Sequence, residues 1–375
     1  MKIITIVGAR PQFVKAAVVS RAIEKYNEES TGESIQELIV HTGQHFDENM
    51  SSIFFDQMGI PKPHYNLEIN SLTHGAMTGK MLEKIEAVLL KEKPDWVLVY
   101  GDTNSTIAGA LAAKKLHIKV AHVEAGLRSF NMEMPEEINR ILTDRISDIL
   151  FCPTQTAIDN LEKEGYANIK SDRIQCGDVM YDAVLFYADR ASRPKGIEQT
   201  VDFVLSTIHR QENTDDPAKL TSIFDALGEI AEKQRVVLPL HPRTVKKLKE
   251  FNIVPAKNIQ ILDPVGYFEM IWLLSHCQMA ITDSGGLQKE AFFFKKPCIT
   301  VRDETEWVEL VQNGSNYLTG HSKDLIIKAF NIIREKEIDF SKALYGKGDA
   351  GQIIVEELIK YSSIDLLKPK LGIIE

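Results

Sequence analysis

Short apolar runs rich in β-branched residues alternate with longer segments of helical periodicity along this 375-residue chain. Parallel strands need a long crossover connection, usually a helix, so this alternation is typical of βαβ units and parallel sheets. The predicted strands form two groups, at residues 3–7, 38–41, 96–100, 120–123 and 149–152, and then at 203–207, 236–240, 259–262, 279–282 and 298–301. The sequence therefore predicts an α/β protein with two doubly wound, Rossmann-like domains, and its length suits two domains.

The charge balance of the chain limits its partners. The sequence has 44 lysines and arginines against 53 acidic residues, a formal net charge of -9, and no basic cluster that would follow a nucleic-acid backbone. The first residues lead directly into Arg10 and Pro11 instead of a signal peptide, and no apolar stretch has the length of a bilayer crossing. We expect a cytoplasmic protein that binds neither nucleic acid nor membrane.

The cysteines and histidines give little support for a metal. The four cysteines lie far apart in the sequence, without the paired spacing of a zinc site or the density of a disulfide scaffold. The chain also lacks the H-E-x-x-H pattern and a short Asp-x-Asp at a strand end. We therefore expect reduced, mostly buried thiols and no metal site.

Polar residues and glycines follow five of the predicted strands, at residues 8–11, 101–103, 124–126, 209–210 and 283–286. In open parallel sheets, ligands bind outside the carboxyl ends of the strands. If the two sheets face each other across a cleft, the first three segments lie on one side of it and the last two on the other. This pattern predicts a ligand site built from strand ends.

The segment after the strand at 279–282 is suited to a diphosphate. Ser284, Gly285 and Gly286 end that strand and begin a helix, where unpaired backbone N–H groups point at one place and glycine lets a phosphate approach closely. Glu290, one helical turn further on, has a carboxylate that accepts hydrogen bonds from the two hydroxyls of a ribose. Together they indicate a nucleoside diphosphate.

Cations follow the first strand of each group. Arg10 and Lys15 lie at the start of a predicted helix, where anions are favoured, although such cations are also common as solvated or ion-paired surface groups. His209 and Arg210 suit a diphosphate or a sugar hydroxyl, and a structural role is the alternative. The first turn lacks G-x-G-x-x-G, which disfavours NAD or FAD.

Three carboxylates are candidates for proton transfer. Asp102 and Glu124 end apolar strands and are followed by small residues, so they remain accessible to a substrate. Asp102 is equally explained as a helix cap. Glu136 follows Pro135 in the first turn of a predicted helix, where acids are normal, so helix chemistry alone explains it.

With these motifs in their order, the chain resembles the non-hydrolysing UDP-N-acetylglucosamine 2-epimerase family over nearly its whole length. The motifs that carry the resemblance are Gly-Ala-Arg-Pro at 8–11 with Lys15, Gly-Asp-Thr at 101–103, the segments 122–128 and 135–140, His-Arg-Gln-Glu-Asn at 209–213, and Asp-Ser-Gly-Gly at 283–286 with Glu290. The family has the two-domain fold of GT-B glycosyltransferases, with an active site in the cleft. The resemblance implies a catalytic domain at 1–172, a UDP-binding domain at 173–355 and a last helix at 356–375 that returns to the first domain.

The resemblance also implies roles, partners and cofactors. Members are typically cytoplasmic homodimers that use neither metal nor redox cofactor. By similarity, Asp102, Glu124 and Glu136 are the catalytic carboxylates, and Lys15 and His209 act with them near the diphosphate. The substrate-binding residues implied in the same way are Arg10, Arg128, Arg210, Ser284, Gly285, Gly286, Glu290 and Arg302.

Departures from the family pattern bear on the substrate. Gln12 stands where the family usually has Glu, Trp307 and Val308 replace an Arg-Pro pair, and Asp47 replaces the second Gln of a motif that binds an activating UDP-N-acetylglucosamine. The variations resemble the branch that converts UDP-2,3-diacetamido-2,3-dideoxy-glucuronate to its manno epimer for surface polysaccharide synthesis. A UDP-N-acetylglucosamine 2-epimerase that gives UDP-N-acetylmannosamine is the alternative within the family.

The expected reaction inverts C2 of a UDP-2-acetamido sugar. Because the proton at C2 is not next to a carbonyl, a carboxylate alone does not remove it at neutral pH, and departure of UDP has to assist. Two other interpretations are a GT-B glycosyltransferase, which transfers the sugar to an acceptor, and a UDP-sugar sensor without catalysis. A sensor needs none of the three carboxylates.

Overall fold

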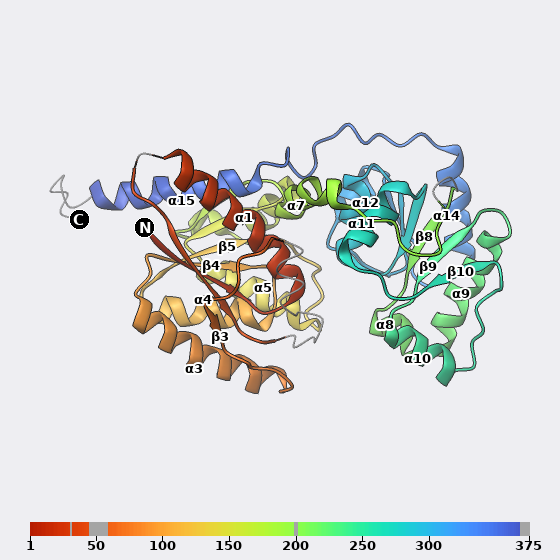
Figure 1. Cartoon of the computed structure of the whole chain (residues 1–375), viewed down its shortest axis with the longest axis horizontal. Helices are drawn as coiled ribbons and strands as arrows, with labels where there is room; N and C mark the ends of the chain where they lie inside the picture. The colour runs from red at the N-terminus through yellow and green to blue at the C-terminus, as the bar shows by residue number, and fades with distance from the viewer. Residues whose placement is uncertain (31, 45–58, 199–201, 368–375) are drawn as a thin grey trace. The chain divides into compact units, whose positions relative to one another are not determined.

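The computed structural model describes residues 1–30, 32–44, 59–198 and 202–367 of the chain. The chain divides into two compact units (Figure 1), of which unit 1 is Met1–Ala183 with Leu344–Glu375 and unit 2 is Val184–Ala343. The sequence placed the change of domain between residues 172 and 173, inside a strand that completes the first sheet, at Asp172–Gln175.

The described part of unit 1 is built on a seven-stranded sheet in the order β3-β2-β1-β4-β5-β6-β7, with every pairing parallel. Its strands are β1 (Lys2–Val7), β2 (Gln36–His41), β3 (Tyr65–Asn66), β4 (Trp96–Tyr100), β5 (Lys119–Val123), β6 (Ile149–Cys152) and β7 (Asp172–Gln175). Its helices are α1 (Arg10–Glu29), α3 (His74–Glu92), α4 (Asn104–Lys115), α5 (Pro135–Ile146), α6 (Gln155–Lys163), the 3-10 turn η1 (Tyr166–Asn168) and α15 (Ala350–Leu367). Helix α7 (Val179–Tyr187) spans the boundary between the units.

Unit 2 contains a six-stranded parallel sheet in the order β10-β9-β8-β11-β12-β13. Its strands are β8 (Val204–Thr207), β9 (Val236–Pro239), β10 (Ile259–Leu262), β11 (Met279–Thr282), β12 (Cys298–Thr300) and β13 (Asn316–Leu318). Its helices are the 3-10 turn η2 (Ala188–Arg190), α8 (Gln211–Thr214), α9 (Pro217–Ala231), α10 (Pro242–Glu250), α11 (Tyr267–His276), α12 (Gly285–Phe293), α13 (Val308–Gln312) and α14 (Lys323–Glu335). Both sheets have the strand order of doubly wound nucleotide-binding folds, as the sequence predicted.

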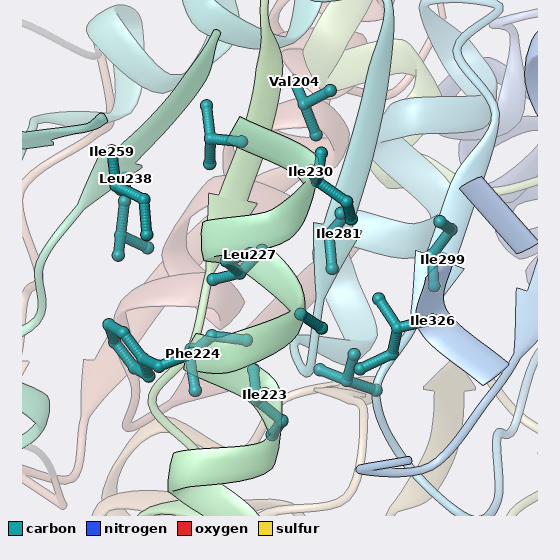
Figure 2. Close-up of a cluster of buried hydrophobic side chains, with 14 of the residues drawn as sticks. Val204, Ile223, Phe224, Leu227, Ile230, Leu238, Ile259, Ile281, Ile299 and Ile326 are labelled. Atoms are coloured by element: carbon teal, nitrogen blue, oxygen red, sulfur yellow. The ribbon is translucent and has the colours of Figure 1, made fainter. Parts of the chain in front are cut away.

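The strands are apolar on both faces because helices cover both sides of each sheet. In unit 2, one cluster joins strand residues such as Val204, Ile281 and Ile299 to residues of α9, with Ile326 of α14 against them (Figure 2). Most of these side chains are fully buried, and each stabilises the unit by roughly 1.5–3 kcal/mol relative to an exposed position. The four cysteines are free thiols that are also buried.

The last helix packs within unit 1. Helix α15 lies beside α1 (Figure 1), and a side chain at Gly351 would meet Val18 Cγ1 at 2.8 Å and Val18 O at 3.1 Å. The Gly351 N–H donates to Asp182 Oδ2 at 2.9 Å, which fixes the start of α15 against α7. Among the described residues, every helix falls short of the length and apolar character that a membrane crossing requires.

Candidate functional site

In unit 1, the chain order of the sheet reverses between β1 and β4, and the residues after these strands and after β5 form the candidate site. The turn after β1 is closely packed, because a side chain at Gly8 would collide with the hydroxyls of Ser105 and Thr42. Arg10 and Pro11 are the first two residues of α1, so Arg10 lies at the N-terminal end of the helix. This end carries the unpaired N–H groups that favour an anion.

Gln12 supports this turn from inside. Its Oε1 accepts hydrogen bonds from the N–H groups of Gly8 and Ala9 at 2.8 and 3.1 Å, and its Nε2 donates to the carbonyl of Tyr100 at 2.6 Å. The side chain is 2 % exposed. An amide both donates and accepts, so the Gln at this position joins the turn after β1 to the end of β4.

Lys15 and Glu124 come together directly. The ammonium group of Lys15, in α1, is ion-paired with the carboxylate of Glu124, which follows β5. A Cβ placed on Gly101 would lie 3.4 Å from Glu124 Oε2 and 3.6 Å from Lys15 Nζ, so the loop that carries Asp102 adjoins the pair. Glu124 has a φ of 72°, a left-handed conformation that is unfavourable for a side chain of this kind.

Asp102 is held by helix α5. Arg140 Nη2 donates to Asp102 Oδ2 at 2.5 Å, and Asn139 Nδ2 donates to the Asp102 carbonyl at 2.9 Å. The Asp102 side chain is 30% exposed. The carboxylate is therefore both fixed in position and open to a ligand.

The two glutamates at the start of α5 lie in different environments. Glu136 is exposed in the first turn. Glu137 is buried, and it accepts hydrogen bonds from Ser129 N and Phe130 N at 3.0 and 2.9 Å and from Arg140 Nη1 at 2.8 Å. Sequence reasoning did not assign a role to Glu137, because an acid next to another acid in a first turn carries no further signal.

Arg128 lies in the interior of unit 1. Its side chain is fully buried, with Nη1 donating to Asp144 Oδ2 at 2.7 Å and with Nε and Nη2 donating to the two oxygens of Glu164 at 2.7 and 2.8 Å. Burial would lower the pKa of Arg128, but the two carboxylates raise it above its ordinary value. The structure thus places Arg128 inside unit 1 between two carboxylates, and its role in substrate binding stays a prediction.

In unit 2, Asp283 anchors the segment after β8. Its buried carboxylate accepts hydrogen bonds from the N–H groups of His209 and Arg210, at 3.0 and 2.9 Å, and from Asn213 Nδ2 at 3.2 Å. The ring of His209 has its Nδ1 3.4 Å from Asp283 Oδ1. Burial lowers the pKa of His209 below its ordinary value, against the opposing effect of Asp283. The imidazole is therefore neutral and able to donate or accept near neutral pH.

The diphosphate seat predicted at residues 284–286 is the start of α12. Ser284 caps the helix by accepting from Leu287 N at 3.4 Å, and a Cβ at Gly286 would meet no atom within 4 Å. A Cβ at Gly285 would lie 3.7 Å from Arg210 Nη2 and from Glu306 Oε2, and 3.9 Å from Trp307 Nε1. The helix N-terminus is thus open beside Gly286, and the side chains of Arg210 and Glu306 border it beside Gly285. Glu290 lies on the same helix and is partly exposed.

Arg302 lies after β12 and is 2 % exposed. Its Nε donates to Glu212 Oε1 at 3.1 Å, and its Nη1 donates to Glu306 Oε2 at 3.2 Å. This pairing orders Glu306 beside Gly285. A direct role in substrate binding stays a prediction.

A pocket of about 200 Å³ adjoins the same strand ends in unit 2. It is lined by His209, His241, Ser284 and by apolar residues that include Leu240, Val265, Met270 and Leu287. The pocket therefore lies between Ser284, at the start of α12, and a wall of apolar side chains. Gln44, His45 and Asp47 correspond to the family motif that binds an activating UDP-N-acetylglucosamine. Gln44 Oε1 accepts hydrogen bonds from Ser105 N and Oγ at 3.1 and 2.8 Å, whereas His45 and Asp47 lie outside the described residues.

The fold is that of a GT-B-like protein with two Rossmann-like units. Unit 1 carries Asp102 and Glu124 at its strand ends, and unit 2 carries the predicted diphosphate site at Ser284, Gly285 and Gly286. The family model of UDP-N-acetylglucosamine 2-epimerase matches residues 27–359. The chain belongs to this family of non-hydrolysing UDP-sugar 2-epimerases, which are isomerases.

Individual relatives agree with this assignment. The UDP-2,3-diacetamido-2,3-dideoxy-D-glucuronate 2-epimerase of Pseudomonas aeruginosa is 58% identical over 361 residues, which cover 96% of this chain and 100% of the relative. The crystal structure of Methanocaldococcus jannaschii UDP-GlcNAc 2-epimerase in complex with UDP-GlcNAc and UDP has a TM-score of 0.85 at 45% identity, over 96% of this chain and 100% of that one. The Neisseria meningitidis enzyme bound to UDP-GlcNAc has a TM-score of 0.83 at 31% identity, with the same coverage.

Proposed function

We propose that the protein converts UDP-2,3-diacetamido-2,3-dideoxy-D-glucuronate to its manno epimer by elimination and readdition of UDP. The identity of 58% to a relative of that name supports the substrate. The observation that carries the chemistry is the adjacency of the Lys15–Glu124 pair to the loop of Asp102. With two carboxylates beside one bound sugar, one is able to remove the proton and the other to return it.

Elimination and readdition of UDP need no oxidant or reductant. A carboxylate takes the proton from C2 while the bond from C1 to the UDP oxygen breaks, which leaves a double bond between C1 and C2. The UDP oxygen then adds back to C1, and a second acid protonates C2 on the opposite face. The proposed carboxylates are Asp102, Glu124 and Glu136. The ammonium group of Lys15 stabilises the negative charge of Glu124 when that residue is ionised.

The leaving diphosphate needs positive charge and hydrogen-bond donors. In unit 2 we assign these roles to the hydroxyl of Ser284, the N–H groups of Gly285 and Gly286, and the side chains of His209 and Arg210, since the Ser284 N–H donates to Thr282 Oγ1 at 2.9 Å. Glu290 is the proposed partner of the ribose hydroxyls, and Arg302 supports Glu306 beside the seat. In unit 1, Arg10 is the proposed phosphate ligand at the start of α1.

UDP-N-acetylglucosamine is the second candidate substrate. It is favoured by the family description and by the relatives that were crystallised with UDP-GlcNAc. We further propose that the enzyme is a cytoplasmic homodimer that supplies surface polysaccharide synthesis, by analogy with the family.

A proton NMR time course with both nucleotides, each as sole substrate, tests the proposal. We expect a new anomeric signal of the manno epimer from the diacetamido uronate and slower conversion of UDP-N-acetylglucosamine. Faster conversion of UDP-N-acetylglucosamine would overturn the substrate assignment. Turnover of neither nucleotide alone, with turnover on addition of a sugar acceptor, would indicate a transferase.

A further inference from the structure

A buried charged group lies behind the strand ends of unit 1, and the reaction proposed above makes no use of it. His122, in β5, is 0% exposed. Its Nε2 lies 2.7 Å from the Gly101 carbonyl oxygen and its Nδ1 lies 2.7 Å from Asp144 Oδ1. A carbonyl oxygen and a carboxylate oxygen both accept hydrogen bonds, so both ring nitrogens of His122 face acceptors and the ring bridges Gly101 to Asp144.

Asp144 receives donors from three directions. Besides His122, its carboxylate accepts from the Gly126 N–H at 3.1 Å and from Arg128 Nη1 at 2.7 Å. Burial would raise the pKa of Asp144, but His122 and Arg128 lower it below its ordinary value, so the group is an anion. With Glu164 on the far side of Arg128, the buried guanidinium group lies between two carboxylates.

Both glycines held by this group belong to the loops that carry the proposed catalytic carboxylates. Gly101 directly precedes Asp102, and Gly126 is the second residue after Glu124. Gly101, Glu124 and Gly126 all have positive φ, at 62°, 72° and 78°. Such conformations persist only where the surroundings fix them, and a Cβ at Gly126 would lie 2.5 Å from the Ala157 carbonyl oxygen.

We propose that His122 and Asp144 are positioning residues that hold the loops of Asp102 and Glu124 at a fixed separation by joining the Gly101 carbonyl to the Gly126 N–H. This inference rests on the proposed function, because it concerns the two carboxylates assigned there. Neither residue touches the sugar. Their effect is on the geometry of proton transfer, in which a displacement of 1 Å costs about 100-fold in rate.

The test compares His122→Gln, Asp144→Asn and the double variant. Each single variant disturbs the contact between the ring and the carboxylate that joins the two glycines, whereas the double variant replaces the pair by two amides that are able to bond to each other, to Gly101 and to Gly126. Asp148→Asn is the matched control, since Asp148 also accepts from a base, Lys114 at 2.8 Å, and from a backbone N–H, Val120 at 2.8 Å. It lies at the amino ends of the strands, away from the candidate site.

The measured quantities are kcat and KM for epimerisation per folded enzyme, the affinity for UDP and the thermal midpoint. We expect kcat to fall roughly 10- to 100-fold in each single variant with unchanged UDP affinity, and the double variant to lose less than the product of the two. Asp148→Asn should lower the thermal midpoint and leave kcat unchanged. A kcat equal to wild type in a folded single variant, or multiplicative losses in the double variant, would overturn the inference.

If His122→Gln does not fold, the kcat of folded Asp144→Asn decides the matter, because a value equal to wild type would overturn the inference. Wild-type enzyme measured in parallel separates this inference from the proposed function. A wild type without epimerase activity contradicts the proposed function, whereas an active wild type with an equally active variant contradicts only the role of His122 and Asp144.

Discussion

The ammonium group of Lys15 is ion-paired with the carboxylate of Glu124, and the two residues lie 109 positions apart in the sequence, one in α1 and one in the segment after β5. Both adjoin Gly101, the residue before Asp102. The pairing places a cation beside a carboxylate that has to exchange a proton, at the carboxyl ends of the central strands.

Glu124→Gln should abolish most turnover while UDP still binds. The amide is nearly isosteric but neither accepts nor returns the C2 proton, so we expect kcat to fall by roughly 100- to 10,000-fold. Glu29→Gln, which removes an exposed partner of Lys25 on α1, is the control and should keep wild-type kcat. Epimerase rates and UDP titrations check both. Retained turnover in Glu124→Gln would remove this carboxylate from the reaction.

Gln12→Glu should destabilise unit 1. The Gln12 amide donates to the Tyr100 carbonyl, and a carboxylate there would face that oxygen without a hydrogen to share. We expect a loss of roughly 1–3 kcal/mol in the free energy of unfolding, measured by urea denaturation at neutral pH. An unchanged free energy of unfolding would show that the turn after β1 does not depend on this donor.

The sequence predicted the strands that are buried on both faces, because their apolar runs are continuous. It missed β3, β7 and β13, which lie at sheet edges and are short or partly exposed. Asp172–Gln175, for example, reads Asp-Arg-Ile-Gln and has only one neighbouring strand to pack beside. Edge strands carry weaker hydrophobic patterns, so periodicity alone does not find them.

The sequence predicted some residues of the candidate site and missed others, because burial that comes from tertiary packing leaves no local pattern. Residues at strand ends, such as Lys15 and Glu124, were found because parallel sheets place ligands there. Glu137 and Asp144 were not found, since acids on a helix are ordinary and their burial comes from tertiary packing. Arg128 was assigned to the substrate from the motif, and only the structure reveals its buried pairing with Asp144 and Glu164.

Asp283→Asn should weaken UDP binding. The Asp283 carboxylate accepts from the N–H groups of His209 and Arg210, and an amide nitrogen in its place would oppose these donors. We expect roughly a tenfold loss of UDP affinity by calorimetry, equivalent to about 1.4 kcal/mol. Asp263→Asn, at an exposed acid after β10, is the matched control. Equal affinity in the two variants would contradict the anchoring role.

The stability of the protein should fall between about pH 6.5 and 4 through His41. Burial lowers the pKa of His41 from 6.5 to about 4. In that interval the unfolded chain binds a proton that the folded ring does not, so the free energy of unfolding decreases as pH falls, by on the order of 3 kcal/mol in total. His41→Asn should flatten this part of the stability profile, whereas His117→Asn, at an exposed histidine, controls for the loss of one imidazole. An identical slope in wild type and His41→Asn would refute the assignment.

The most direct test of the account is epimerisation in D₂O, followed by NMR at C2 of the product. Removal of the C2 proton by a carboxylate, departure of UDP and protonation from the other face predict that product carries deuterium at C2. Product formed with its original C2 hydrogen would contradict the proposed reaction and the roles of Asp102, Glu124 and Glu136 in it.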